Sequence, residues 1–249
     1  MILPNVKDAV HKAWLYRTLI AIVDDQSLVD SLRFKGETCA AMRGFLNRFS
    51  VDLDFDFVGQ SQELPVLRKR LENIFFALGL EIKDKSNKVP QYFLKYPAVG
   101  RDRSTLKIDI TFPVPKTNVY EFANLLEIDR LVNCQTIETM FANKLVALIE
   151  RFEKNGSIAG RDLYDIHYFF IGGYKYNTEV IEERRGETID KFLHHLIDFI
   201  ERHINNTVID QDLNTLLPQM DFRRVREILK RETVMFLRDE VMRIDNINR

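Results

Sequence analysis

Three aspartates are the residues in this sequence best suited to carry out chemistry. Asp52 and Asp54 alternate with apolar residues in VDLDFDFV (51–58), and Asp109 lies within TLKIDITF (105–112). On a strand, residues i and i+2 project from one face, roughly 7 Å apart. Like charges so close cost energy unless a cation neutralises them, and Mg²⁺ or Mn²⁺ prefers such carboxylate oxygens. If the two strands are neighbours, the three carboxylates converge on a site for divalent metal.

A solvated strand face is the alternative explanation of the alternating aspartates. Strands are depleted in aspartate, so a run that contains Asp52, Asp54 and Asp56 needs some explanation. Asp56 lies toward the end of the strand, and we assign it to the solvated face rather than to the metal site.

A glycine turn precedes the aspartates. Gly36-Glu37-Thr38 stands ahead of a helix expected from about Thr38 to Phe45, with Thr38 as its predicted N-cap. Such a turn presents free N–H groups to a phosphate. Taken alone, one glycine is better explained as an ordinary turn.

Hydrophobic periodicity indicates the elements that must position these residues. We expect helices near 5–24 and 62–78, and strands near 33–35, 51–58, 79–84, 91–97 and 105–112, with a weaker strand signal over 114–128. After about residue 134 the pattern becomes helical, with helices near 136–154, 162–171, 187–205 and 221–243. The predicted fold class is therefore α/β (α+β), with a mixed-sheet domain over 1–130 and a C-terminal helical bundle over 131–249.

Composition is that of an ordinary globular protein. The 249 residues include 36 Lys and Arg against 37 Asp and Glu, and 45% are hydrophobic, which excludes a disordered polyelectrolyte. Basic residues gather in 81–107, where seven lysines and arginines face three acids, and this stretch could approach an RNA backbone. We expect a cytoplasmic protein without a membrane segment, because no signal peptide and no apolar run of about 20 residues is visible. Cys39 and Cys134 match no zinc spacing and are expected to be reduced and buried.

Together these residues resemble a known family. FKGETCAAMRGFLNRFSVDLDFDF is similar to the first motif of the AbiEii/AbiGii nucleotidyltransferase toxins, within the polymerase-β-like nucleotidyltransferase superfamily. The matching positions of that motif are Lys35, Gly36, Thr38, Arg48, Ser50, Asp52 and Asp54. The second motif corresponds to KIDI with Asp109, the third to ANKLVAL around Lys144, and the fourth to Arg161, Asp162 and Asp165. The four motifs follow the family's order and cover about 33–166.

The later motifs also have a physical interpretation of their own. An apolar stripe at helical spacing predicts a buried face for the helix that carries Lys144; it comprises Phe141, Leu145, Leu148 and Phe152. Lys144 lies beside that stripe and could meet phosphates as a point charge, or else extend to solvent as a surface lysine. Asp162 and Asp165 share one helical face; the alternative explanation is an acid pair favoured by the helix dipole.

The resemblance implies a Mg²⁺-dependent (or Mn²⁺-dependent) transfer of a nucleoside monophosphate from an NTP to an acceptor hydroxyl. It implies that Asp52, Asp54 and Asp109 bind metal, and that Asp109 helps to deprotonate the acceptor. Gly36, Thr38, Ser50 and Lys144 would hold the triphosphate. The remaining nucleotide-binding candidates are Lys35, Arg48, Arg161, Asp162 and Asp165. The family also implies a toxin of a toxin–antitoxin or abortive-infection system, with tRNA, another RNA or a protein as acceptor and an antitoxin as partner.

One position departs from the family pattern. The second glycine of the turn is Glu37 here, and a carboxylate beside a triphosphate is repulsive unless it points away or pairs with Lys35 or Arg48. The alternative function is therefore a catalytically weakened nucleotide- or RNA-binding module or regulator on the same fold. A kinase-like phosphoryl transfer is a third possibility.

Overall fold

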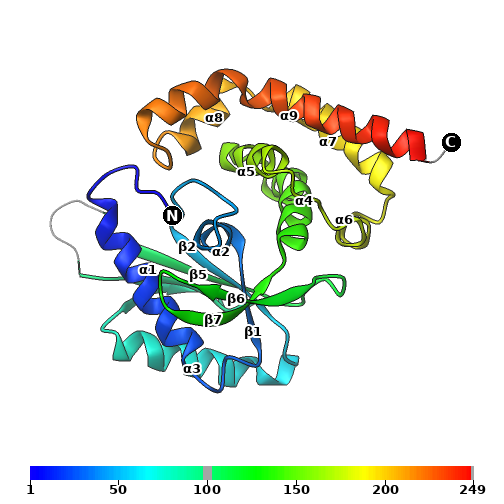
Figure 1. Cartoon of the computed structure of the whole chain (residues 1–249). Coiled ribbons are helices and arrows are strands. Elements are labelled where there is room, and N and C mark those ends of the chain that lie inside the picture. The colour runs from blue at the N-terminus through cyan, green and yellow to red at the C-terminus, as the bar shows by residue number, and fades with distance from the viewer. Residues whose placement is uncertain (98–102, 248–249) are drawn as a thin grey trace. The chain divides into compact units, whose positions relative to one another are not determined.

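The computed structural model describes residues 1–97 and 103–247 (Figure 1). The chain folds into two compact units. The first, called here the sheet unit, comprises Met1–Gly44, Arg48–Val114 and Val119–Thr136. The second, the helical unit, comprises Phe45–Asn47, Pro115–Asn118 and Ile137–Arg249.

A seven-stranded mixed sheet in the order β3-β4-β5-β2-β1-β7-β6 forms the centre of the sheet unit (Figure 1). Its strands are β1 (Leu32–Lys35), β2 (Asp52–Phe57), β3 (Glu81–Lys85), β4 (Gln91–Lys95), β5 (Thr105–Thr111), β6 (Tyr120–Leu125) and β7 (Arg130–Gln135). The β2–β5 and β1–β7 pairs are parallel, whereas the other neighbours are antiparallel. β2 therefore lies inside the sheet, between β1 and β5.

Alternating side chains divide this sheet into an apolar face and a polar face. Leu53, Phe55 and Ile108 are at most 1% exposed and lie on the apolar face. Helices that belong to the sheet unit are α1 (Asp8–Val23), the short α2 (Gly36–Met42) and α3 (Leu64–Ala77), the last preceded by a 3₁₀ turn at Ser61–Glu63. Cys39 of α2 and Cys134 of β7 are buried beside each other, and both are free thiols, as predicted.

The helical unit contains α4 (Ile137–Asn155), α5 (Gly160–Ile171), α6 (Thr178–Arg185), α7 (Ile189–His203), α8 (Asn206–Leu213) and α9 (Gln219–Ile247). Helix α5 packs against α4, α8 and α9, and α7 packs against α9. Phe141, Leu145 and Leu148 of α4 are fully buried, as their helical spacing predicts. Among the described residues, no helix has both the length and the apolarity that a membrane span requires.

The predicted fold class is confirmed, and most predicted elements are present within a few residues. Sequence periodicity missed β7, α6 and α8, all of which are eight residues or shorter. The predicted boundary at residue 130 falls on the first residue of β7. Thr38 is not the N-cap of α2, because Lys35 occupies that position and the helix already begins at Gly36.

Candidate active site

The two aspartate-bearing strands are neighbours in the sheet. β2 and β5 run parallel, with Asp54 opposite Asp109 and Asp52 opposite Lys107. Residues directly opposite each other in a sheet project from the same face, so the three aspartates share the polar face. The condition under which the sequence predicted their convergence is therefore met.

Asp54 lies where negative charge is in excess. Its pKa is raised to about 8, first by burial and then by the charges of Glu37, Asp52 and Asp109, while Lys35 lowers it only in part. Carboxylates that repel each other at one place, and that supply hard oxygen donors, fit a divalent cation. Asp52, Asp54 and Asp109 are therefore suitable to hold Mg²⁺ or Mn²⁺.

Lys107 provides a resident positive charge at one edge of this group. Its Nζ lies 2.6 Å from Asp109 Oδ2, and the side-chain amide of Gln91 donates to the same oxygen over 3.0 Å. Burial lowers the pKa of Lys107, but the hydrogen bond to Asp109 and the nearby aspartates raise it overall. Lys107 is the first residue of the predicted KIDI motif but was given no role from the sequence, and Gln91 was not predicted to belong to the site.

The glycine turn packs directly against the aspartates. Gly36 has φ +75°, and a Cβ built on it would lie 2.5 Å from Asp54 Oδ2. Any other residue here would collide with that carboxylate and strain the backbone. The Thr38 hydroxyl donates to the carbonyl oxygen of Asp52 over 2.5 Å and lies 2.8 Å from Ser50 Oγ. The turn and the aspartate strand are therefore held as one piece of structure.

Glu37, the departure from the family pattern, pairs with an arginine. Its Oε1 lies 3.5 Å from Arg48 Nη2, which is one of the two partners considered from the sequence. Arg48 is 1% exposed and also donates to the carbonyl oxygen of Phe49. The pairing does not remove the influence of Glu37, because its charge still raises the pKa of Asp54.

Asp56 is not part of a solvated strand face, and that interpretation is wrong. Its side chain is fully buried and accepts hydrogen bonds from Lys35 Nζ, the Tyr120 hydroxyl and the Gln135 amide, at 2.6, 2.9 and 2.6 Å. Lys35 Nζ also donates to Thr111 Oγ1 over 2.7 Å. Lys35, a predicted nucleotide-binding residue, is thus engaged by two oxygen acceptors on neighbouring strands.

A second charged cluster lies within the helical unit. Lys144 Nζ is 2.9 Å from Asp162 Oδ1 and 3.0 Å from Asp165 Oδ2, and both aspartates are fully buried. Arg151 Nε lies 3.3 Å from the other oxygen of Asp162. Sequence analysis missed Arg151, although it lies two helical turns after Lys144. Arg161, on the same helix as both aspartates, has Nη1 3.8 Å from Asp212 Oδ1 of α8.

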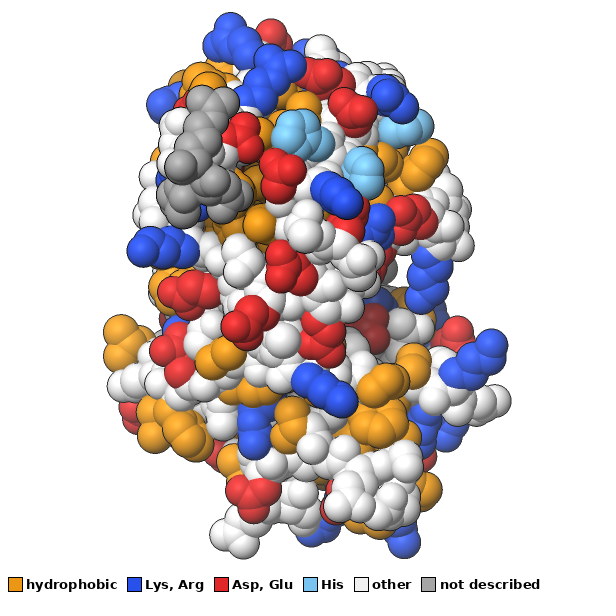
Figure 2. Space-filling view, turned by 90° about the vertical axis from the view of Figure 1, so that its right-hand side faces the viewer, with side chains coloured by type: hydrophobic (Ala, Val, Ile, Leu, Met, Phe, Trp, Pro, Cys, Tyr) orange, Lys and Arg blue, Asp and Glu red, His pale blue; other side chains and the backbone are white. Residues whose placement is uncertain are grey.

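The basic stretch over 81–107 lies mainly on the edge of the sheet formed by β3 and β4. Lys83, Lys88 and Lys95 are exposed there, whereas Lys107 pairs with Asp109. Arg101, another member of the stretch, lies outside the described residues. Figure 2 shows acidic and basic side chains interspersed on one face of the molecule, in keeping with the net charge of −1.

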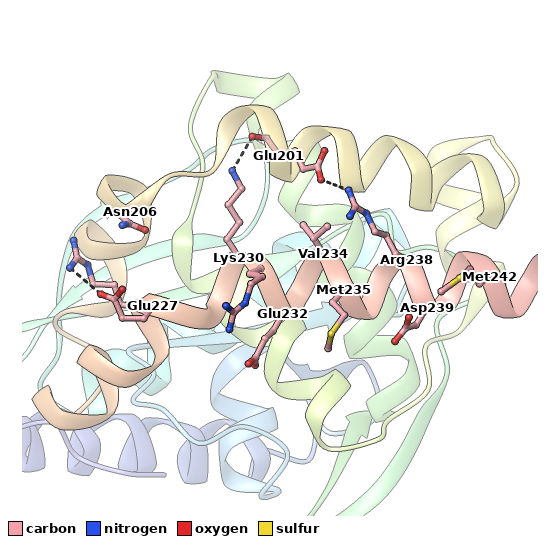
Figure 3. A pocket seen from close by; sticks show the side chains of 12 residues that line it. Glu201, Asn206, Glu227, Lys230, Glu232, Val234, Met235, Arg238, Asp239 and Met242 are labelled. Atoms are coloured by element: carbon pink, nitrogen blue, oxygen red, sulfur yellow. Dashed lines mark hydrogen bonds and ion pairs between the residues drawn. The ribbon is translucent and has the colours of Figure 1, made fainter.

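A groove of about 890 Å³ runs along α9 in the helical unit (Figure 3). Its charged side chains largely pair with one another or with the backbone. Arg238 contacts the Glu201 carboxylate at 2.7 Å, and Lys230 donates to the Glu201 carbonyl oxygen over 2.9 Å. None of the predicted site residues lines this groove. The aspartate site is the stronger candidate, because there the charges are not balanced.

Comparisons with solved structures place this fold among nucleotidyltransferases. A candidate nucleotidyltransferase from Helicobacter pylori matches with a TM-score of 0.62 and 18% identity, over 98% of both chains. JHP933 from the same organism matches with a TM-score of 0.51 and 19% identity, over 100% of both chains. MenT4, a nucleotidyltransferase toxin from Mycobacterium tuberculosis, matches with a TM-score of 0.51 and 13% identity, over 94% of this chain and 84% of that one. These identities support likeness of fold alone.

A comparison with curated protein sequences gives no match. The model of the nucleotidyl transferase AbiEii toxin family, of type IV toxin–antitoxin systems, matches residues 17–235. That span includes both aspartate-bearing strands, the glycine turn and the Lys144 cluster. The chain therefore belongs to the AbiEii family of nucleotidyltransferase toxins.

Proposed function

We propose that this protein transfers a nucleoside monophosphate from an NTP to an acceptor hydroxyl in a Mg²⁺-dependent reaction. The observation that carries the proposal is the convergence of Asp52, Asp54 and Asp109 on one sheet face, against a turn whose Gly36 has no room for a side chain. Bound metal would supply positive charge that offsets the developing charge on the phosphoryl oxygens.

Residues of the sheet unit have different roles in the proposed reaction. Asp52, Asp54 and Asp109 hold the metal, and Asp109 also accepts the proton of the attacking hydroxyl. The acceptor oxygen forms a bond to the α-phosphorus, the bond from that phosphorus to the bridging oxygen breaks, and pyrophosphate leaves. The backbone of the Gly36 turn binds the triphosphate. Thr38, Arg48 and Ser50, which the sequence predicted to bind nucleotide, are each at most 2% exposed. In this proposal they act on the nucleotide by holding the turn, through the contacts of Thr38 with Ser50 and Asp52 and of Arg48 with Glu37.

The Lys144 cluster is a second requirement for activity in this proposal. Asp162 and Asp165 orient the Lys144 ammonium, which binds nucleotide phosphate, and Arg161 contributes from the same helix. We assign the nucleotidyltransferase core to 1–130 and this helical contribution to 131–249. The protein acts in the cytoplasm as a toxin that an antitoxin restrains. Its acceptor is tRNA, another RNA or a protein, and the exposed lysines of 81–107 favour an RNA.

Label transfer tests the proposal directly. The purified protein is incubated with each α-³²P-labelled NTP, Mg²⁺ and either total RNA or protein lysate, and labelled products are separated on gels. Asp54→Asn should reduce transfer roughly a thousandfold, whereas Asp30→Asn, which changes an exposed aspartate outside the basic stretch, should not affect it. Mass spectrometry of the product distinguishes an added nucleoside monophosphate from an added phosphate. Transfer that persists undiminished in Asp54→Asn would contradict the proposed site.

Glu37 favours one second candidate, a nucleotide- or RNA-binding module with weakened catalysis. Its carboxylate stands next to the turn glycine and adds to the negative charge that acts on Asp54. Calorimetry with Mg²⁺ and each NTP separates the two functions. Binding without turnover in every acceptor mixture would favour the binding module, and turnover would exclude it.

A further inference from the structure

Lys35 and Asp54 stand directly opposite each other on β1 and β2. Opposed residues of an antiparallel pair have Cβ atoms about 5 Å apart, and opposite charges in such a pair attract. Asp54 is therefore the nearest carboxylate that the pairing of the strands offers to the Lys35 ammonium. An ion pair between them would place a lysine where the proposed function needs a metal.

The Lys35 ammonium is directed to other partners. It donates to Asp56 Oδ1 over 2.6 Å and to Thr111 Oγ1 over 2.7 Å. Asp56 is opposite Arg33, two register positions further along the strands and on the same face, so the Lys35 side chain reaches diagonally across β2. Both acceptors draw the ammonium in the same direction, along the sheet and away from the position opposite Asp54.

Asp56 is itself fixed from the far side. Its second oxygen accepts from the Tyr120 hydroxyl over 2.9 Å and from the Gln135 amide over 2.6 Å, and these donors come from β6 and β7. A buried carboxylate with several donors is rigid, because every lost hydrogen bond would leave a desolvated charge. Asp56 therefore offers Lys35 a fixed partner.

We propose that Asp56 is a positioning residue that, together with Thr111, holds the Lys35 ammonium away from Asp54 and so keeps the Asp54 carboxylate open to a divalent cation. This inference rests on the proposed function, because it assumes that Asp54 binds metal. The charges around Asp54 are consistent with this inference. Lys35 lowers the pKa of Asp54 less than burial and the charges of three carboxylates together raise it. A merely structural Asp56 would affect folding stability, but not metal affinity through Lys35.

Mn²⁺ binding, followed by electron paramagnetic resonance without nucleotide, separates these roles. Asp56→Asn removes the charge that holds Lys35, so the ammonium should move to Asp54 and weaken Mn²⁺ binding about fivefold. The double variant Asp56→Asn/Lys35→Met should return to within about twofold of the wild type, because the competing ammonium is gone. Wild-type affinity in Asp56→Asn, or a double variant as weak as Asp56→Asn, would overturn the inference.

Thr111→Val keeps the test decisive if Asp56→Asn does not fold. It removes one of the two acceptors of Lys35 and leaves Asp56 intact, so Mn²⁺ binding should weaken about twofold, and Lys35→Met should again reverse the loss. Asp54→Asn separates a failure of the proposed function from a failure of this inference. If Asp54→Asn binds Mn²⁺ like the wild type, the proposed metal site is wrong. If Asp54→Asn loses Mn²⁺ binding while Asp56→Asn and Thr111→Val keep it, only the role of Asp56 is wrong.

Discussion

The sheet unit and the helical unit each gather a group of carboxylates, partly exposed in the first and fully buried in the second, and they balance the charge differently. In the helical unit, Asp162 and Asp165 are matched by Lys144 and Arg151 at 2.9 to 3.3 Å. Around Asp54, carboxylates outweigh cations, and after burial, the largest cause, these charges help to raise the pKa of Asp54 to about 8. A balanced cluster is stable as it stands, whereas an unbalanced one gains from a bound cation. The carboxylates of the helical unit are therefore suited to position Lys144, whereas those around Asp54 are suited to bind a metal ion.

The largest expected effect is that of Asp54→Asn on catalysis. Nucleotide transfer should fall roughly a thousandfold, the rate equivalent of about 4 kcal/mol, because the metal loses a charged ligand. The metal-free variant should nevertheless melt a few degrees higher than the wild type near pH 8, since an amide avoids carboxylate repulsion. Label transfer and thermal unfolding with EDTA measure the two effects. A variant that is both inactive and less stable would show that Asp54 is not in a repulsive environment.

Lys144→Met should give the opposite result for stability. Removing the lysine leaves Asp162 and Asp165 buried without their main counter-ion, which typically costs about 3 to 5 kcal/mol in the free energy of unfolding. Urea unfolding measures this loss. Lys154→Met is the matched control, because Lys154 is an exposed lysine on the same helix and should change stability little. Equal, small effects of both variants would contradict the account of a mutually neutralised cluster.

The pH dependence of stability should come from the unbalanced cluster. The pKa of Asp54 is about 8 in the folded protein and near 4 in the unfolded chain, so the folded state holds the extra proton between these values. Stability contributed by Asp54 is therefore greatest at low pH and falls as pH rises from about 4 to 8. Thermal unfolding with EDTA should show a slope over pH 5–8 that is reduced in Asp54→Asn. Added Mg²⁺ should restore stability at pH 8, and an unchanged slope in Asp54→Asn would contradict this assignment.

Sequence patterns predicted those parts of the site that depend on local spacing. The alternation of VDLDFDFV identified the strand and the shared face of Asp52 and Asp54, and the apolar spacing around Lys144 identified a buried helix face. The convergence of Asp109 with Asp52 and Asp54 was predicted only on the condition that their two strands are neighbours. The sequence of one strand does not specify which strand lies beside it in a sheet. The observed β2–β5 pairing supplied that information.

Features that depend on distant partners could not be predicted. Asp56 alternates as its neighbours do, but Tyr120 and Gln135, more than sixty residues away, bury it. These donors lie on β6 and β7, and β7 lacked a recognisable alternation because Leu131 is 66% exposed. Thr38 is a residue type common at N-caps, yet its hydroxyl donates to the backbone carbonyl oxygen of Asp52 on β2. In each case, tertiary contacts override a local preference.

Gly36→Ala should lower the free energy of unfolding less than Lys144→Met does, but more than the same change does at Gly79. Gly36 and Gly79 have nearly equal φ values, +75° and +73°, so alanine strains both backbones similarly. Only at Gly36 would the new Cβ meet Asp54 Oδ2, whereas at Gly79 nothing lies within 4 Å. The difference in the free energy of unfolding should be about 1 to 2 kcal/mol, and Mn²⁺ affinity should fall only in Gly36→Ala. Equal losses in both variants would show that the turn does not constrain Asp54.

The smallest expected effect is that of Glu37→Gln, which reduces the imbalance without removing a metal ligand. Because Glu37 adds negative charge around Asp54, its neutralisation should lower the pKa of Asp54 but weaken Mn²⁺ binding about two- to threefold at pH 7, since a divalent cation loses more attraction than a proton does. The variant should also be less stable, because the buried Arg48 loses its counter-ion. Glu81→Gln, an exposed glutamate on β3, is the control for the loss of one charge. If NTP affinity and turnover rise in Glu37→Gln, the glutamate restrains an active enzyme by repelling the triphosphate; if neither changes, it provides no support for a weakened binding module.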